Sequence, residues 1–435
     1  MLLDVIPRHV SARRRGPGHA RRLSGHRVRR TIGLALTAVV GFVGTGAATT
    51  YFRLQNNIES ADVTDLLGQY RPPQPKPDPE DPNAGVPVNI LIIGSDTREG
   101  NERYATDTSV TGERSDTTIV AHISGDRSRV ELVSIPRDIL SEQPQCDRSD
   151  GSSAGARSQA MFNEAFSRGA DRGSETDGAA CVQRTIEHLT GVYIHHFVIV
   201  DMTGFVNMVD AVGGIPMCVP EAINSPKAKL VLDAGNHDFD GVTALRYARA
   251  RTGEGLDGSD TSRIGRQQAL MAATARTVLN KNLLTDVPDL IRFLNAATKS
   301  LTVSSGIAGI PDMTGLAYSL RGVAPGDITF MTIPNRPYPE NRNRLIFDDE
   351  AATVWANLAA DVPMTTGLAG VEQPVAPETP AAPETPATPG AETPAAPQTP
   401  AAPDAETPAA PETPAPTRTP GVEPFTPADV TAVCG

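Results

Sequence analysis

The alternation of apolar and polar positions divides residues 86–362 into predicted strands and helices. Short, nearly continuous apolar runs such as VPVNILIIG (86–94) predict buried strands, whereas apolar residues at helical spacing, as in VQRTIEHLTG (182–191), predict amphipathic helices. Together they predict an α/β or α+β domain of about 275 residues, enough for one substantial core. The expected strands are 86–94, 114–124, 129–136, 193–201, 215–223 and 327–334, and the expected helices are 161–166, 182–191, 202–214, 239–247, 264–280, two within 284–323, and 348–361.

Charged residues gather where the first three predicted strands share an edge of the sheet. Consecutive strands with short connections favour an antiparallel meander, which brings together the end of the first strand, the start of the second and the end of the third. Structural ion pairs are one explanation of the cluster. The other is that Asp96 and Asp116 hold Mg²⁺ while arginines neutralise phosphate oxygens. The charged side chains at this edge are Asp96, Arg98, Arg114, Asp116, Arg137 and Asp138.

A second group of arginines lies in residues 242–268, VTALRYARARTGEGLDGSDTSRIGRQQ. If YARAR is extended, Arg249 and Arg251 leave the same face of the chain. Arg263 and Gln267 lie four residues apart at the start of the next helix, so they share a face near a helix N-terminus, which favours anions. Phosphate binding suits the planar guanidinium fork. Surface ion pairing, which contributes little stability, is the alternative.

The first 52 residues have the pattern of a membrane anchor. Residues 31–52 contain no charged residue and are long enough to span a hydrocarbon core of about 30 Å. Residues 1–30 contain nine arginines and one acid, so the positive-inside rule places them in the cytoplasm and the remainder outside the cytoplasmic membrane. A cleaved signal peptide is the alternative, because Ala47 and Ala48 offer small residues.

The segments that flank the domain are predicted to be spacers. Residues 53–85 form a stalk, in which 54–67 is a short helix and the proline-rich remainder is extended. Residues 363–423 repeat a PETPAAP-type pattern that cannot bury a core and should form a disordered coil. The final segment, 424–435, regains apolar residues and is expected to dock on the folded body.

Charge and cysteine content narrow the function classes. The net charge is −12, and removing the +8 of residues 1–30 leaves −20, so nucleic acid is not expected as a partner of the main body. Four cysteines suit an oxidising compartment, and their spacing gives no zinc motif. Three pairings are possible, of which we favour Cys146 with Cys181 and Cys218 with Cys434.

Several other polar residues are expected to have structural roles. His195 and His196 are adjacent in a predicted strand and point to opposite faces, so they cannot act as a pair. We interpret them as packed or hydrogen-bonded histidines. Asp201 and Asp210 are also interpreted as structural.

In order and spacing, these landmarks resemble the LytR-CpsA-Psr (LCP) family. The matching stretches are NILIIGSDTR, RSDTTIV, SIPRD, YIHHFVIVDMTGFVNMVDAVGGI, DGVTALRYARAR and DTSRIGRQQ, across roughly residues 88–362. The arginine-rich leader, the Ala/Pro-rich tail and the paired cysteines look like an actinobacterial member of corynebacterial or mycobacterial type. The resemblance implies an α/β/α sandwich around a mixed, largely antiparallel sheet, with a hydrophobic cleft that takes a polyprenyl chain.

The resemblance also implies an activity. Family members transfer a glycan from a polyprenyl-pyrophosphate carrier to peptidoglycan through a phosphodiester bond. For this type the glycan is similar to arabinogalactan, and the acceptor is the muramic acid 6-hydroxyl. The family's metal ligands, for Mg²⁺ or alternatively Mn²⁺, fall on Asp96 and Asp116. Its pyrophosphate-binding residues fall on Arg98, Arg114, Arg137, Arg249, Arg251, Arg263 and Gln267; Arg266 matches a common position, and the implied catalytic set is Arg114, Arg137, Arg249, Arg251 and Asp260.

The sequence departs from the family pattern in two places. Where many members have a Gly-Gly pair, this chain has RGADRGSETDGAAC, residues 168–181, so the rim of the cleft is expected to differ. In addition, no second folded domain is expected after residue 363.

Phosphoryl transfer depends mainly on charge neutralisation and positioning, which suits these residues. The acceptor hydroxyl would attack the sugar-linked phosphorus, and polyprenyl phosphate would leave; whether Asp116 or Asp260 takes the proton stays open. The rivals are a pyrophosphatase without glycan transfer, a membrane-bound transcriptional attenuator and a non-catalytic wall-binding protein. The attenuator is disfavoured because the 30 arginine-rich residues contain no helix-turn-helix pattern. Oligomeric state also stays open.

Overall fold

The computed structural model describes residues 25–69, 71–76, 85–95, 115–280, 287–368, 420–427 and 429. The chain forms two compact units, Met1–Arg53 and Leu54–Gly435. Helix α1, Gly25–Asn57, supplies the described part of the first unit. Within it, Arg29–Asn57 has a mean hydropathy of 1.7 in its most apolar window, none of which is buried. This helix is therefore long and apolar enough to cross a membrane, in agreement with the predicted span at residues 31–52.

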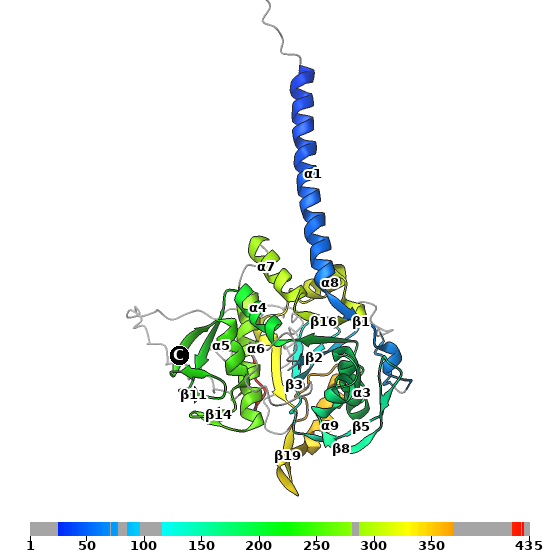
Figure 1. Ribbon diagram of the computed structural model, residues 1–435, viewed down its shortest axis with the longest axis vertical. Helices are drawn as coiled ribbons and strands as arrows, with labels where there is room; N and C mark the ends of the chain where they lie inside the picture. The colour runs from blue at the N-terminus through cyan, green and yellow to red at the C-terminus, as the bar shows by residue number, and fades with distance from the viewer. Residues whose placement is uncertain are drawn as a thin grey trace, which may run out of the picture. The chain divides into compact units, whose positions relative to one another are not determined.

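The second unit is built on a seven-stranded sheet of order β1-β16-β9-β2-β3-β4-β17 (Figure 1). Strands β2, β3 and β4 pair antiparallel, which confirms the predicted meander. The β16–β9 pair is also antiparallel, whereas β1–β16, β9–β2 and β4–β17 are parallel. The sheet is thus mixed, as expected, although antiparallel pairs are not in the majority. The strands are β1 Glu59–Ala61, β2 Val88–Ser95, β3 Ser115–Ile123, β4 Val130–Ser134, β9 His196–Val200, β16 Leu301–Ser304 and β17 Ile328–Thr332.

Helices cover both faces of this sheet, because alternate residues of a strand point to opposite sides. Leu91 and Ile93 of β2 pack into the main core with α2 (Glu164–Ala170), α3 (Glu175–Thr190) and α9 (Asp349–Ala359). Ile90 and Ile92 face the other way and pack towards α8 (Ile310–Ser319). The predicted α/β/α sandwich is therefore confirmed.

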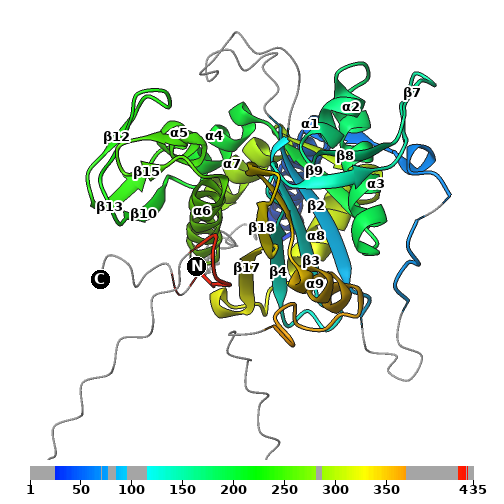
Figure 2. The ribbon, with the colours of Figure 1, turned by 90° about the horizontal axis from the view of Figure 1, so that it is seen from below.

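A lobe with its own core lies beside the sheet, on the other side of α6, Asp260–Asn280 (Figure 2). Its helices α4 (Met202–Ala211), α5 (Gly241–Arg249) and α7 (Val287–Thr298) pack with small two-stranded sheets around Ile215, Phe239 and Leu270. The small sheets of the lobe pair β10 (Ile215–Val219) with β13 (Gly235–Phe239), β11 (Ile223–Ser225) with β12 (Leu230–Leu232), and β14 (Thr252–Gly253) with β15 (Leu256–Asp257).

The remaining short elements lie outside the seven-stranded sheet. One predicted helix, 161–166, is present but displaced, because the strand β8 runs to Met161 and α2 spans Glu164–Ala170. The other short elements are η1 (Thr64–Leu66), β5 (Leu140–Gln143), β6 (Cys146–Asp147), β7 (Ser153–Ala154), β8 (Arg157–Met161), η2 (Ser305–Ile307), η3 (Pro325–Asp327), β18 (Asn335–Tyr338) and β19 (Asn341–Phe347).

The predicted stalk is in part wrong, because its first half belongs to the folded body. Instead of one helix over 54–67, α1 ends at Asn57 and β1 joins the edge of the sheet beside β16. The apolar positions Val63 and Leu67 are buried in the main core. Farther on, Arg71 pairs with Glu187 at 2.5 Å. The folded body therefore begins well before the predicted boundary at residue 86.

The described C-terminal residues 420–427 dock on the body, as predicted for the final segment. Phe425 is fully buried, forms a bridge with Phe330 of β17 and stacks on its ring at 5.4 Å. Most of the expected coil at 363–423 lies outside the described residues, but its predicted start is wrong, because Met364 and Leu368 are buried in the main core.

Two cysteines form the predicted Cys146–Cys181 disulfide, with a Cα–Cα distance of 5.3 Å. It ties β6 to α3, whose first turn is closed by a capping box between Ser174 and Asp177. Cys218 is also disulfide-bonded. Its expected partner, Cys434, lies outside the described residues.

Candidate functional site

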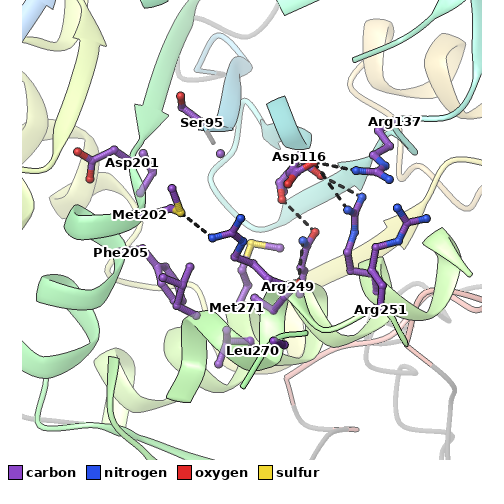
Figure 3. Close-up of a pocket in the computed structure, with 18 of the residues that line it drawn as sticks. Ser95, Asp116, Arg137, Asp201, Met202, Phe205, Arg249, Arg251, Leu270 and Met271 are labelled. Atoms are coloured by element: carbon purple, nitrogen blue, oxygen red, sulfur yellow. Dashed lines mark hydrogen bonds and ion pairs between the residues drawn. The ribbon is translucent and has the colours of Figure 1, made fainter. Parts of the chain in front are cut away.

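A pocket of about 700 Å³ opens between the edge of the main sheet and the lobe (Figure 3). This volume is typical of ligand-binding pockets. Its wall has an apolar part and a charged part. One part is apolar, with Met202 and Phe205 from α4, Leu245 from α5 and Leu270 and Met271 from α6. The other part carries the charged side chains Asp116, Arg137, Arg249, Arg251 and Arg263.

Asp116 owes its position to a β-bulge between β2 and β3. Gly94 pairs with Thr117, but the next residue, Ser95, pairs with Ser115. Asp116 is therefore the extra residue of the bulge, and bulges characteristically redirect such a side chain. A Cβ on Gly94 would lie 3.2 Å from that of Thr117, so glycine permits the close strand approach here. The predicted start of the second strand thus delivers Asp116 to the pocket.

Two arginines converge on Asp116 from different elements. Arg137, just beyond β4, donates from Nη1 to Asp116 Oδ1 at 2.9 Å. Arg263, in the first turn of α6, places Nη1 3.8 Å from the same oxygen and donates from Nη2 to the Asp116 carbonyl at 3.3 Å. The predicted convergence is confirmed for Asp116 and Arg137. Asp138 also lies at this edge, with Oδ1 3.7 Å from Arg137 Nε. The remaining members, Asp96, Arg98 and Arg114, lie outside the described residues.

Asp260 lies behind these arginines rather than on the pocket wall. Its side chain is 5% exposed, with Oδ1 2.5 Å from Arg263 Nη2 and 3.6 Å from Arg137 Nε. Burial lowers the pKa of Arg263. Burial also opposes the charge on Arg137, but Asp116, Asp260 and Asp138 outweigh it and raise the pKa of Arg137. Asp260 therefore holds two guanidiniums in place, and we treat it as a positioning residue.

Arg249 and Arg251 both line the pocket, but the extended backbone predicted for YARAR is wrong. Arg249 is the last residue of α5, and Ala250 turns the chain out of the helix with φ −61° and ψ 127°. Helix α5 thus runs two residues beyond the predicted end, and the helix end lies between the two arginines. Arg249 donates to Met202 Sδ at 2.9 Å.

Side chains of helix α6 hydrogen-bond to the backbone around this turn. The helix begins at Asp260, before the predicted start at Ile264. Gln267 accepts from Thr117 Oγ1 at 3.0 Å and donates to the Ala248 carbonyl at 3.2 Å, so it joins β3 to α5. Arg266 is not among the lining residues and donates to the Ala250 carbonyl. Its contact is therefore with the turn that carries Arg249 and Arg251.

The residues interpreted as structural have structural contacts. Asp201 caps α4 by accepting from the Gly204 amide, although it also borders the pocket. Asp210 accepts from the Gly241 amide at 2.7 Å. His195 Nδ1 accepts from the Asn89 amide at 3.0 Å, and His196 Nδ1 lies 3.2 Å from Ser304 Oγ.

The sequence interpretation did not single out Met202, Phe205 and Ser95, which line the pocket, or Glu175, which binds Ser95. Met202 and Phe205 supply an apolar wall, and no sequence signal distinguishes them from ordinary core residues of an amphipathic helix. Ser95 donates to Glu175 Oε1 at 2.6 Å. Glu175 falls within the segment where the chain departs from the family pattern, and that departure was a signal for it.

The expected Mg²⁺ would need carboxylate ligands in this pocket. Among the described residues, no group of three or more His, Cys, Asp or Glu side chains is arranged to hold a metal. Two aspartates border the pocket; Asp201 caps α4, which leaves Asp116 as the candidate ligand, and one or two carboxylates with substrate phosphates are a common Mg²⁺ environment. Asp116 therefore fits the ion, while the second expected ligand, Asp96, lies outside the described residues.

Comparison with known proteins agrees with this architecture. The LytR_cpsA_psr family model matches residues 50–360. The chain is 30% identical over 263 residues to the cell wall biosynthesis protein LcpA of Corynebacterium glutamicum, covering 57% of this chain and 50% of the relative. It is 32% identical over 280 residues to the probable cell wall biosynthesis protein LcpB of the same organism, covering 63% and 59%. The matched region thus spans only about half of these relatives.

Solved structures were also matched. A LytR-Csp2A-Psr enzyme from Actinomyces oris is 22% identical with a TM-score of 0.48, covering 69% of this chain and 96% of that one. TagT bound to LIIa-WTA is 18% identical with a TM-score of 0.48, covering 69% and 99%. Because the family model covers residues 50–360, more than half of the sequence, this chain belongs to the LytR_cpsA_psr family.

Proposed function

We propose that this protein is a membrane-anchored phosphotransferase that attaches a polyprenyl-pyrophosphate-linked glycan, arabinogalactan in type, to peptidoglycan. The proposal rests on the family membership and on the cell wall biosynthesis roles named for LcpA and LcpB. The observation that carries it is the two-part pocket, which joins an apolar wall to a cluster of arginines.

An amphipathic ligand matches this division of the pocket. The apolar wall of Phe205, Leu245 and Leu270 suits a hydrocarbon chain, which is favourable to bury at roughly 25 cal/mol per Å². Arg249, Arg251 and Arg263 lie where the head group of such a ligand would sit, and guanidiniums bind phosphate oxygens through paired hydrogen bonds. A lipid pyrophosphate has both parts.

The reaction requires one bond to form and one to break. The acceptor hydroxyl oxygen bonds to the sugar-linked phosphorus, the bond from that phosphorus to the bridging oxygen breaks, and polyprenyl phosphate leaves. The hydroxyl proton passes to a base, for which Asp116 is better placed than Asp260 because it lines the pocket. Arginines at the phosphates stabilise the charge that develops during transfer.

Mg²⁺, held by Asp116 together with Asp96, would supply further charge neutralisation at the phosphates. Asp116 is already engaged by Arg137 and Arg263, so binding the ion and substrate would exchange some of these contacts. This ligand pair is our proposal.

A variant pair on one helix tests the assignment. Purified chain is incubated with the lipid-linked glycan, peptidoglycan and Mg²⁺, and released polyprenyl phosphate and wall-linked glycan are both quantified. Arg249→Ala should lower the transfer rate about a hundredfold or more, the usual effect of removing a transition-state charge partner. Arg246→Ala is the matched control, because Arg246 lies in the same last turn but does not line the pocket. Equal rates for both variants would contradict the proposal.

A further inference from the structure

Exposed apolar side chains occur on three helices of the second unit. Outside α1, five described large apolar residues are exposed. Three of them are Leu279 at the end of α6, Ile291 of α7 and Tyr318 of α8, which are 45%, 39% and 65% exposed. Single exposed apolar side chains are normal on a soluble protein, whereas a group of them on one face marks an interaction surface.

Two of these helices, α7 and α8, are tied directly to the residues that follow the apolar run of α1. Gln55 Nε2 donates to the Ala308 carbonyl at 2.9 Å and Gln55 Oε1 accepts from the Ile310 amide at 3.0 Å, which fixes the start of α8. Asn57 Nδ2 donates to Asn295 Oδ1 of α7 at 3.2 Å. All of these residues belong to the second unit.

Chain connectivity then places α7 and α8 close to any bilayer that holds the apolar run. That run ends at Phe52, only three residues before Gln55 and five before Asn57. At a helical rise of 1.5 Å per residue, both side chains lie within about 8 Å of its end along the chain. The helices that they bind cannot be far from the membrane surface.

We propose that the end of α6, α7 and α8 form a membrane-contact surface, defined by Leu279, Ile291 and Tyr318, that rests on the bilayer. Tyr318 suits this position because tyrosine concentrates at membrane–water interfaces. The guanidinium of Arg321 stacks over its ring at 4.1 Å, so its charge can reach lipid phosphates while its stem covers apolar surface. Figure 1 shows α7 and α8 at the same end of the second unit.

This surface is close to the wall of the pocket. Helix α7 packs on α4, whose Met202 and Phe205 line the apolar part. Packed helix axes lie about 8–10 Å apart, so one helix separates bilayer from pocket. The contact would therefore present the pocket to a chain that leaves the membrane. In this respect the inference rests on the proposed lipid donor, although the contact itself can be measured without turnover.

The test uses the full-length chain in proteoliposomes and quenching by brominated phospholipids. The wild type contains one tryptophan, Trp355, which is 4% exposed in the main core and supplies a constant background. One reporter is added at a time in the variants Ile291→Trp, Tyr318→Trp and Val231→Trp. Val231 is the matched control, since it is 75% exposed on β12, in the outer part of the lobe (Figure 2).

We expect brominated lipids to remove most of the added emission in Ile291→Trp and Tyr318→Trp and to leave Val231→Trp and the wild type unchanged. Absence of quenching at both reporter sites, or equal quenching at Val231→Trp, would overturn the proposal, and so would failure of the wild type to float with vesicles. Glycan transfer measured on the same preparations separates this result from the proposed activity, because transfer without quenching refutes the contact alone.

Discussion

Individual charged residues are held in the pocket by neighbours that do not themselves face it. Asp260 fixes Arg137 and Arg263 from behind, and Arg266 binds the carbonyl between Arg249 and Arg251. Such partners orient a cationic site without touching its ligand, and misplacing reacting groups by about 1 Å can reduce a rate a hundredfold.

Replacing Asp260 by asparagine should therefore impair turnover more than binding. The variant keeps the shape of the side chain but removes the negative charge beside two guanidiniums, the buried one of Arg263 and the half-buried one of Arg137. We expect kcat to fall between about tenfold and a hundredfold with little change in KM for the lipid donor. Steady-state kinetics of glycan transfer measures both. A rise in KM at unchanged kcat would show that Asp260 acts on ground-state binding instead.

His195 should make the folded state sensitive to acid. Burial, with positive charge on His196, Arg71 and His122, lowers the pKa of His195 from 6.5 to about 4. Its neutral form accepts from the Asn89 amide. Because the unfolded chain binds the proton more readily, this stabilisation is complete above about pH 6.5 and is lost as the pH falls towards 4.

Thermal unfolding followed between pH 7 and 4 checks this dependence. A His195→Asn variant should lose less stability over that interval than the wild type. His196→Asn is a useful companion, because burial also lowers the pKa of His196. Parallel curves for the wild type and His195→Asn would contradict the assignment.

Among the secondary-structure elements, α6 is the framework of the site, because it faces the pocket with Arg263, Gln267 and Leu270 and binds the C-terminal segment on another side. The buried side chain of Gln268 donates to Ser134 Oγ at 2.9 Å and accepts from the Gly421 amide at 3.0 Å. A Cβ on Gly265 would lie 2.3 Å from the Pro420 carbonyl oxygen, so glycine permits this close packing.

Removing the Phe425 ring should weaken the packing of the C-terminal segment against α6. Truncating a fully buried phenylalanine to alanine typically costs about 3–5 kcal/mol. If the segment detaches while the rest of the unit stays folded, the observed loss of stability will be smaller than this. We expect Phe425→Ala to lower both the free energy of unfolding and the transfer rate. Val422→Ala, at a position 70% exposed on the same segment, is the control. A stable, fully active Phe425→Ala variant would show that the segment does not support the site.

The sequence predicted elements best where pattern and burial coincide. The meander of β2, β3 and β4 and the helix that presents Arg263 and Gln267 both follow from periodicity. The edge strand β1 and its neighbour β16 were missed because ESA and LTVS, at three and four residues, are too short to show a strand pattern. YARAR was read as extended because the pair spacing fits a strand, whereas tertiary contacts to Arg266 and Gln267 fix a helix end there.

For the whole molecule, the second unit carries both the pocket and the residues that continue from the apolar helix. A helix long and apolar enough to cross a membrane and a pocket with an apolar wall are thus encoded in one chain, with fewer than 10 residues between Phe52 and the first strand of the sheet. The proposed function requires that the bound lipid pyrophosphate be cleaved by an acceptor from the wall rather than by water.

The most direct test follows the sugar-linked phosphorus itself. A lipid-linked glycan carrying ³²P at that position is incubated with the protein, Mg²⁺ and peptidoglycan, and the wall polymer is separated and digested. We predict that the label enters peptidoglycan fragments together with the glycan and that polyprenyl phosphate is released unlabelled. Recovery of the label only in soluble glycan phosphate would identify hydrolysis and contradict the proposed transfer.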